Sequence, residues 1–145
     1  ILDVSLLDII SKLRKLLSMN NKDKLYKYRA YVKDVYDGDT ITVDISLGFH
    51  VTMTDIKVRL IGIDTPEIRT RDLEEKARGY EVRDWLRERI LGKKVLLHTK
   101  EKGKFGRWLG HIWSLEEENI CEENSYNKQM ITEGLAKEYF GGKRK

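Results

Sequence analysis

The fold is decided by the stretch Arg59-Leu60-Ile61-Gly62-Ile63-Asp64-Thr65-Pro66-Glu67, in which an apolar strand ends among polar side chains. Apolar residues alternate up to this point, so Arg59 faces away from its apolar neighbours. Pro66, the sole proline of the sequence, fixes φ and ends the strand. We therefore expect Asp64 and Glu67 to reach the same side of a tight turn, close to an arginine.

Outward from this stretch, the pattern predicts a small β-rich domain. Five segments have the alternation or β-branched content of strands, namely Tyr28–Val35, Thr40–Ile45, Asp55–Ile63, Val95–Thr99 and Gly110–Trp113. Residues 74–91 and Tyr126–Lys137 have helical spacing. Five short strands with a helix late in the order predict an α+β fold, mainly β, in which a small barrel carries helices.

The first 24 residues form a separate segment, followed by one domain over residues 25–145. Residues 2–19 have the 4-3-4-3 leucine and isoleucine spacing of an amphipathic helix, and residues 20–24 read as a linker. A signal peptide is disfavoured because Asp8 interrupts the apolar run and basic residues follow it. No run has the length of a membrane span. The compartment stays open, secreted or intracellular.

Composition narrows the function classes only a little. The 145 residues are 40% hydrophobic, which argues against wholesale disorder, and one cysteine excludes an internal disulfide framework. The net charge of +4 is modest. Residues 1–29 hold seven basic and three acidic side chains, whereas residues 30–145 hold 21 of each. The charge excess therefore belongs to the N-terminal segment, and nucleic-acid binding has to be argued from particular residues.

Two further clusters have both a structural and a functional interpretation. Asp37-Gly38-Asp39-Thr40 is typical of a hairpin turn, but Asp39 could also present a carboxylate to a hard cation. The loop Lys100–Trp108 is basic, contains glycines and includes Lys104 and Phe105. It is either a solvated hairpin tip or a surface that follows a phosphate backbone.

Together the three clusters supply what phosphodiester hydrolysis needs. Asp39 and Asp64 offer hard oxygen ligands to Ca²⁺. Arg59 and Arg107 can each bind phosphate oxygens through two N–H groups and stabilise the charge of the transition state. Glu67 is a candidate general base for the attacking water.

These motifs resemble the staphylococcal nuclease, or thermonuclease, family. The resemblance rests on five groups of residues in the same order and at similar separations over residues 28–140: Asp37-Gly38-Asp39-Thr40, Val58-Arg59-Leu60, Asp64-Thr65-Pro66-Glu67, Lys104-Phe105-Gly106-Arg107 and Gly134-Leu135-Ala136-Lys137. It implies a five-stranded OB-type barrel with attached helices and Ca²⁺-dependent hydrolysis of DNA and RNA. Cleavage of the P–O5′ bond would leave 3′-phosphates.

The resemblance also implies roles for single residues. Asp39, Asp64 and the Thr65 backbone carbonyl would bind calcium, Arg59 and Arg107 would bind phosphate, and Glu67 would position or activate water. Substrate contacts would come from Lys104 and Phe105, with Phe105 where the best-known members have tyrosine. The stacking aromatic of the family falls on either Tyr139 or Phe140.

Two alternatives follow from the same comparison. The barrel also serves as a non-catalytic binding module for nucleic acid or protein, although such copies usually lose the site residues that this chain keeps. The best-known members continue into a C-terminal helix, whereas this sequence has an N-terminal one. We expect residues 2–19 to fold back over the barrel, with self-association through the leucine stripe as the alternative.

Overall fold

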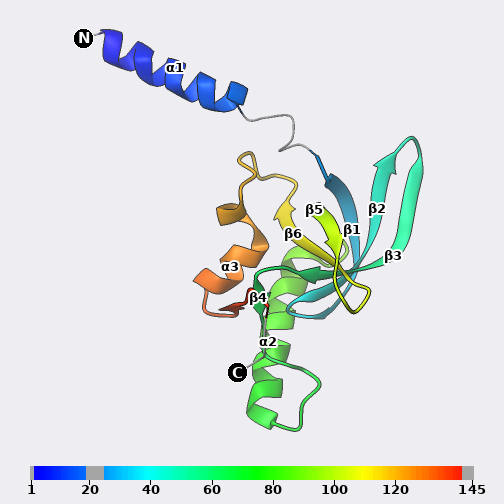
Figure 1. Ribbon diagram of the computed structural model, residues 1–145. Helices are drawn as coiled ribbons and strands as arrows, with labels where there is room; N and C mark the ends of the chain where they lie inside the picture. Colours follow the sequence, from blue (N-terminus) through cyan, green and yellow to red (C-terminus); the bar gives the residue numbers. More distant parts are fainter. Residues whose placement is uncertain (1, 19–24, 142–145) are drawn as a thin grey trace.

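The protein is described by a computed structural model (Figure 1), which covers residues 2–18 and 25–141 and, within the first helix, the side chains from Ser5 to Arg14. The barrel strands are β1 Lys27–Asp37, β2 Thr40–Gly48, β3 Val51–Leu60, β5 Lys94–Lys102 and β6 Trp108–Ser114. They close in the order β1-β2-β3-β6-β5. The predicted α+β fold, a five-stranded OB-type barrel with attached helices, is confirmed.

Alternation along the strands fills the barrel with branched apolar side chains. Val32, Val43, Val58, Leu97 and Ile112 are fully buried. Most neighbouring strands are antiparallel, but β3 and β6 run parallel over three residue pairs, from Val58 with Trp108 to Leu60 with Gly110. This parallel seam brings the end of β3 beside the start of β6, where the sequence places two of the candidate arginines.

Helix α2 (Leu73–Ile90) packs along the barrel wall. The Asp72 side chain caps its first turn by accepting hydrogen bonds from the backbone N–H groups of Glu74 and Glu75. Val82 and Leu86 are buried against the core at a spacing that keeps them on one helical face. The helix thereby covers the barrel on the side of the β1–β2 turn.

The last helix is shorter than the sequence predicted. The sequence predicts a helix that reaches Lys137, but α3 (Tyr126–Thr132), which follows Ser125 and the 3₁₀ turn η2 (Glu122–Asn124), ends after seven residues. Gly134 adopts a φ of 74°, and the N–H of Leu135 bonds back to the carbonyl of Met130. This left-handed glycine terminates the helix. The chain then forms β7 (Lys137–Glu138), which pairs with β4 (Ile63–Asp64) beside the barrel.

The N-terminal helix α1 (Leu2–Ser18) confirms the predicted helix, whereas the expected fold-back is not seen. Every described side chain from Ser5 to Arg14 is exposed, including Leu6, Ile9 and Leu13 at 56%, 50% and 50%. In Figure 1 the helix lies apart from the barrel. The part of its stripe between Ser5 and Arg14 is therefore not covered by this chain's own core. Met19 and the expected linker, residues 20–24, lie outside the described residues. Within the described residues, no helix has the length and apolarity needed to cross a membrane.

Candidate active site

The β1–β2 turn carries two carboxylates into a tightly packed corner. A Cβ atom on Gly38 would lie 2.5 Å from Val82 Cγ1 and 2.9 Å from Thr65 Cγ2. Only a glycine therefore lets this turn approach both α2 and the segment after β4. The approach places Asp39, which is 5% exposed, beside the turn that carries Asp64.

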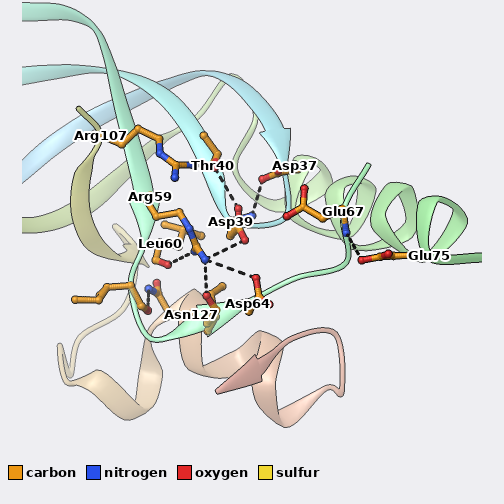
Figure 2. Close-up of polar contacts among 12 residues, drawn as sticks. Asp37, Asp39, Thr40, Arg59, Leu60, Asp64, Glu67, Glu75, Arg107 and Asn127 are labelled. Atoms are coloured by element: carbon orange, nitrogen blue, oxygen red, sulfur yellow. Dashed lines mark hydrogen bonds and ion pairs between the residues drawn. The ribbon is translucent and has the colours of Figure 1, made fainter. Parts of the chain in front are cut away.

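Arg59 joins the carboxylates and is held by its own turn (Figure 2). Its Nη1 donates to the Leu60 carbonyl at 2.6 Å and its Nη2 to the Ile63 carbonyl at 2.8 Å. Nη2 also lies 3.2 Å from Asp39 Oδ2 and 3.9 Å from Asp64 Oδ1. The two carbonyl bonds take two of the five N–H donors of a guanidinium and fix its plane. The structure thus brings together three of the residues that the sequence singled out.

Arg107 reaches the same cluster through a hydroxyl. Its Nη1 donates to Thr40 Oγ1 at 3.1 Å, and Thr40 Oγ1 donates to Asp39 Oδ1 at 3.1 Å. Arg107 leaves the β5–β6 turn, whereas Arg59 lies near the end of β3, and the parallel seam lets Arg59 approach Asp39 Oδ2 while Arg107 reaches Asp39 Oδ1 through Thr40. Thr40 therefore links the two halves of the site.

Asp37 adds a third carboxylate to this corner. Its Oδ1 accepts a hydrogen bond from the backbone N–H of Asp39 at 3.1 Å. The pKa of Asp37 is raised to about 7, first by burial and then by its hydrogen bond with and repulsion from Asp39, with Glu67 acting in the same direction. Carboxylates so close together favour a proton or a cation between them.

The segment after β4 is drawn close to α2. A Cβ on Gly79 would lie 2.9 Å from the Pro66 carbonyl and 3.0 Å from the Glu67 carbonyl, so α2 admits this backbone only at a glycine. The backbone N–H of Glu67 donates to Glu75 Oε1 at 3.2 Å. Figure 2 shows the Glu67 side chain close to Asp37. The predicted general base thus lies at the rim of the carboxylate cluster.

The four expected substrate-binding residues are spread around this centre. Lys104 and Phe105 are exposed at the β5–β6 turn, with Phe105 at 84%. The backbone N–H of Tyr139 donates to the Gly62 carbonyl, which places this half-buried residue beside the β3–β4 turn. Phe140 lines a small hollow together with α3 residues and lies 86% exposed. Tyr139 is therefore partly buried beside the β3–β4 turn, whereas the neighbouring Phe140 is largely exposed to solvent.

Two residues of the cluster had only a turn role in the sequence interpretation. Asp37 and Thr40 flank Asp39 in the Asp-Gly-Asp-Thr motif, which we treated as a turn with one acidic ligand. Asp37 ends β1 and Asp39 lies in the turn, and an aspartate that accepts from the N–H two residues later is a local signal that could have identified the carboxylate pair. Nothing in the local sequence indicates that Thr40 contacts a residue 67 positions away.

Comparison with known proteins identifies the family of this chain. The family model described as staphylococcal nuclease homologue matches residues 57–145. The chain belongs to the staphylococcal nuclease family. Three of its relatives illustrate the range of the family. The Staphylococcus hyicus thermonuclease is 31% identical over 123 residues, which cover 83% of this chain and 63% of the relative. The Staphylococcus intermedius thermonuclease is 32% identical over 111 residues, covering 75% and 58%. A probable endonuclease of Candida glabrata is 37% identical over 89 residues, covering 59% and 32%.

The chain spans about three-fifths of the length of the two staphylococcal relatives, at 63% and 58%. The match to the family model includes Arg59, Asp64, Glu67 and Arg107, whereas Asp39 precedes it. The matched residues of this chain thus include four residues of the cluster. Asp39 lies before them in the sequence and reaches the cluster through the β1–β2 turn.

Proposed function

We propose that this chain is a Ca²⁺-dependent nuclease that hydrolyses phosphodiester bonds of DNA or RNA, cleaving the P–O5′ bond and leaving 3′-phosphates. The observation that carries the proposal is the meeting of Asp39, Asp64 and Arg59 at one point, with Arg107 joined through Thr40. The family relationship supports it, since two relatives are named thermonucleases.

Phosphate binding falls to the two arginines. The Arg59 guanidinium has only 13% of its side chain exposed and is fixed by the Leu60 and Ile63 carbonyls. A preorganised guanidinium loses little entropy on binding a phosphate and stabilises the extra negative charge of the five-coordinate transition state. Arg107, which reaches Asp39 through Thr40, can bind a second oxygen of the same phosphate.

The donor set fits a hard divalent cation. Within residues 2–18 and 25–141, no group of three or more His, Cys, Asp or Glu side chains is arranged as a metal site. The proposed set needs only two carboxylates, Asp39 and Asp64, together with the Thr65 carbonyl and water, which are all oxygen donors. Burial raises the pKa of Asp37 first, and repulsion from the Asp39 and Glu67 carboxylates adds to it, so further positive charge at this corner would be favourable. A bound Ca²⁺ would supply that charge and polarise the phosphoryl group.

Glu67 takes the proton of the attacking water in this proposal. The water oxygen forms a bond to phosphorus, its proton passes to the Glu67 carboxylate, and the P–O5′ bond breaks. The 5′-oxygen then takes up a proton from solvent, so that one water is consumed for each bond cleaved. Glu67 suits this role because it lies at the rim of the cluster, partly exposed beside Asp37.

The deciding experiment is hydrolysis of single-stranded DNA and RNA by the full chain with Ca²⁺, against a chelator control. We expect cleavage only with Ca²⁺, and phosphatase-sensitive 3′ ends on the products. Glu67→Ala and Arg107→Ala should each lower kcat by about 100-fold or more. Binding of nucleic acid in Ca²⁺ with no cleavage would favour the alternative, a non-catalytic binding module.

Matched control variants separate chemistry from general charge effects. Arg83→Ala removes an arginine that pairs with Asp84 on α2, and Glu88→Ala removes a glutamate whose side chain is 79% exposed. Both should leave kcat within about twofold of the unsubstituted chain, as expected for surface changes away from the site. If kcat falls equally in the control and site variants, the roles assigned to Arg107 and Glu67 are wrong.

A further inference from the structure

All four backbone carbonyls of the turn Leu60–Ile63, which binds the Arg59 guanidinium, accept hydrogen bonds. The Leu60 and Ile63 carbonyls accept from the Arg59 guanidinium, and the Gly62 carbonyl accepts from the backbone N–H of Tyr139. The fourth carbonyl, that of Ile61, accepts from Asn127 Nδ2 at 2.8 Å. Gly62 adopts a φ of 82°, which a glycine tolerates, and four hydrogen bonds from three residues, Arg59, Tyr139 and Asn127, hold this tight turn.

Asn127 uses its whole amide at this junction. Its Nδ2 also donates to the Gly110 carbonyl at 3.0 Å, and its Oδ1 accepts from the backbone N–H of Ile112 at 3.2 Å. The side chain is 3% exposed, and the same Gly110 carbonyl accepts from the N–H of Ile61. The two N–H donors and the oxygen acceptor of the Asn127 amide thus each bind one backbone group. Only a side-chain amide of this length provides this combination.

The position of Asn127 extends the parallel seam. The β3–β6 ladder ends at Leu60 and Gly110, and Asn127 continues it with a side chain that reaches from β6 to the β3–β4 turn. It stands in the first turn of α3, whose N-terminus is capped by the buried hydroxyl of Ser125. A packed helix thus delivers this amide at a fixed distance from the turn.

We propose that Asn127 is a positioning residue for catalysis, which sets the Leu60–Ile63 turn and through it the Arg59 guanidinium. The inference rests on the proposed nuclease function. Asn127 acts on Arg59 through the turn that they share, because both side chains donate hydrogen bonds to its carbonyls. Loss of the amide frees the Ile61 carbonyl and lets the neighbouring carbonyls shift, and a misplacement of about 1 Å can cost on the order of 100-fold in rate.

The first test compares Asn127→Ala with Thr99→Val in the full chain. Thr99 is also buried and donates through Oγ1 to the Leu109 carbonyl of β6 at 2.7 Å, but this bond does not reach the turn. Both variants lose buried hydrogen bonding and should be less stable, so assays are run where circular dichroism shows both folded. We expect Asn127→Ala to lower kcat by about 10- to 100-fold with KM within about threefold. Thr99→Val should stay within about twofold in kcat.

A double-variant cycle tests whether the effect passes through Arg59. In the Arg59→Ala background, adding Asn127→Ala should lower kcat by less than about twofold, because the group that it positions is already gone. Asn127→Asp, which keeps the acceptor and loses both donors, should behave like Asn127→Ala. A full, additive loss in the Arg59→Ala background overturns the inference, and so does a kcat loss equal to that of Thr99→Val.

A final measurement does not depend on cleavage. In the ¹⁵N-labelled chain, the guanidinium N–H signals of Arg59 should exchange slowly with solvent, since two of them bond to carbonyls. Asn127→Ala should speed this exchange by about tenfold or more, and Thr99→Val should not. If the chain cleaves no nucleic acid, the proposed function fails while this result still decides the role of Asn127. Unchanged exchange in Asn127→Ala overturns it.

Discussion

Replacing Asp37 by asparagine should stabilise the protein, and the gain should grow with pH. The Asp37 carboxyl is 9% exposed and faces the carboxylates of Asp39 and Glu67, and its pKa is raised to about 7. Asparagine keeps an oxygen that can accept the backbone N–H of Asp39 but carries no charge. The substitution therefore removes the repulsion without removing the turn's hydrogen bond.

The magnitude follows from linkage between proton binding and folding. A rise in the pKa of Asp37 from the ordinary 3.8 to about 7 corresponds to about 4 kcal/mol of unfolding free energy. The native state binds the Asp37 proton more tightly than the unfolded state does. The contribution of Asp37 to the unfolding free energy is therefore fully present below pH 3.8 and is lost as pH rises towards about 7. Between about pH 5 and about pH 8, the wild-type chain should lose about 2 to 3 kcal/mol that Asp37→Asn keeps.

The assay is urea unfolding at these two pH values in buffer with a chelator, followed by tryptophan fluorescence. Asp34→Asn serves as the control, since it removes a carboxyl from the same strand whose side chain is 56% exposed. The pH comparison cancels any constant effect of the amide itself. A stability difference between Asp37→Asn and the wild-type chain that is the same at both pH values would refute the reasoning.

Three further predictions concern packing, metal binding and association. Gly38→Ala should lower the unfolding free energy by about 1–3 kcal/mol in urea unfolding, because its Cβ would overlap Val82 and Thr65; unchanged stability would mean that the corner is loose. Ca²⁺ at about 100 times its Kd should add about 2.7 kcal/mol to the unfolding free energy, measured by the same method, and the gain should vanish in a chelator. Sedimentation velocity of the full chain should show self-association through the exposed stripe of α1, and the double variant Leu6→Asn, Leu13→Asn should be monomeric. A wild-type chain that stays monomeric at all concentrations tested contradicts the last expectation.

The barrel and the centre of the site were predictable because they depend on local patterns. Strand alternation shows which residues face the core, and it sets Arg59 on the opposite face from Val58 and Leu60. Pro66 marks where the strand must end. These local rules are enough to place an arginine and two acids near one turn.

Long-range contacts were beyond such reasoning. The bond from Asn127 to the Ile61 carbonyl joins residues 66 positions apart, and an asparagine in a helical pattern carries no sign of it. The early end of α3 depends on the left-handed conformation of Gly134, which competes with good helical spacing after Thr132. The exposure of α1 likewise depends on whether the barrel has an apolar surface for the helix to cover. The sequence of the helix alone does not contain that information.

The parallel seam between β3 and β6 couples the chemistry to the completion of the fold. Under the proposed mechanism it unites Arg59 with Arg107, which are separated by about fifty residues of chain. Closing so long a loop costs entropy before any contact compensates for it. Under that mechanism, a chain in which the seam has not formed would have the proposed ligands Asp39 and Asp64 and one arginine, but not Arg107 in place. We therefore expect cleavage of nucleic acid to require closure of the barrel.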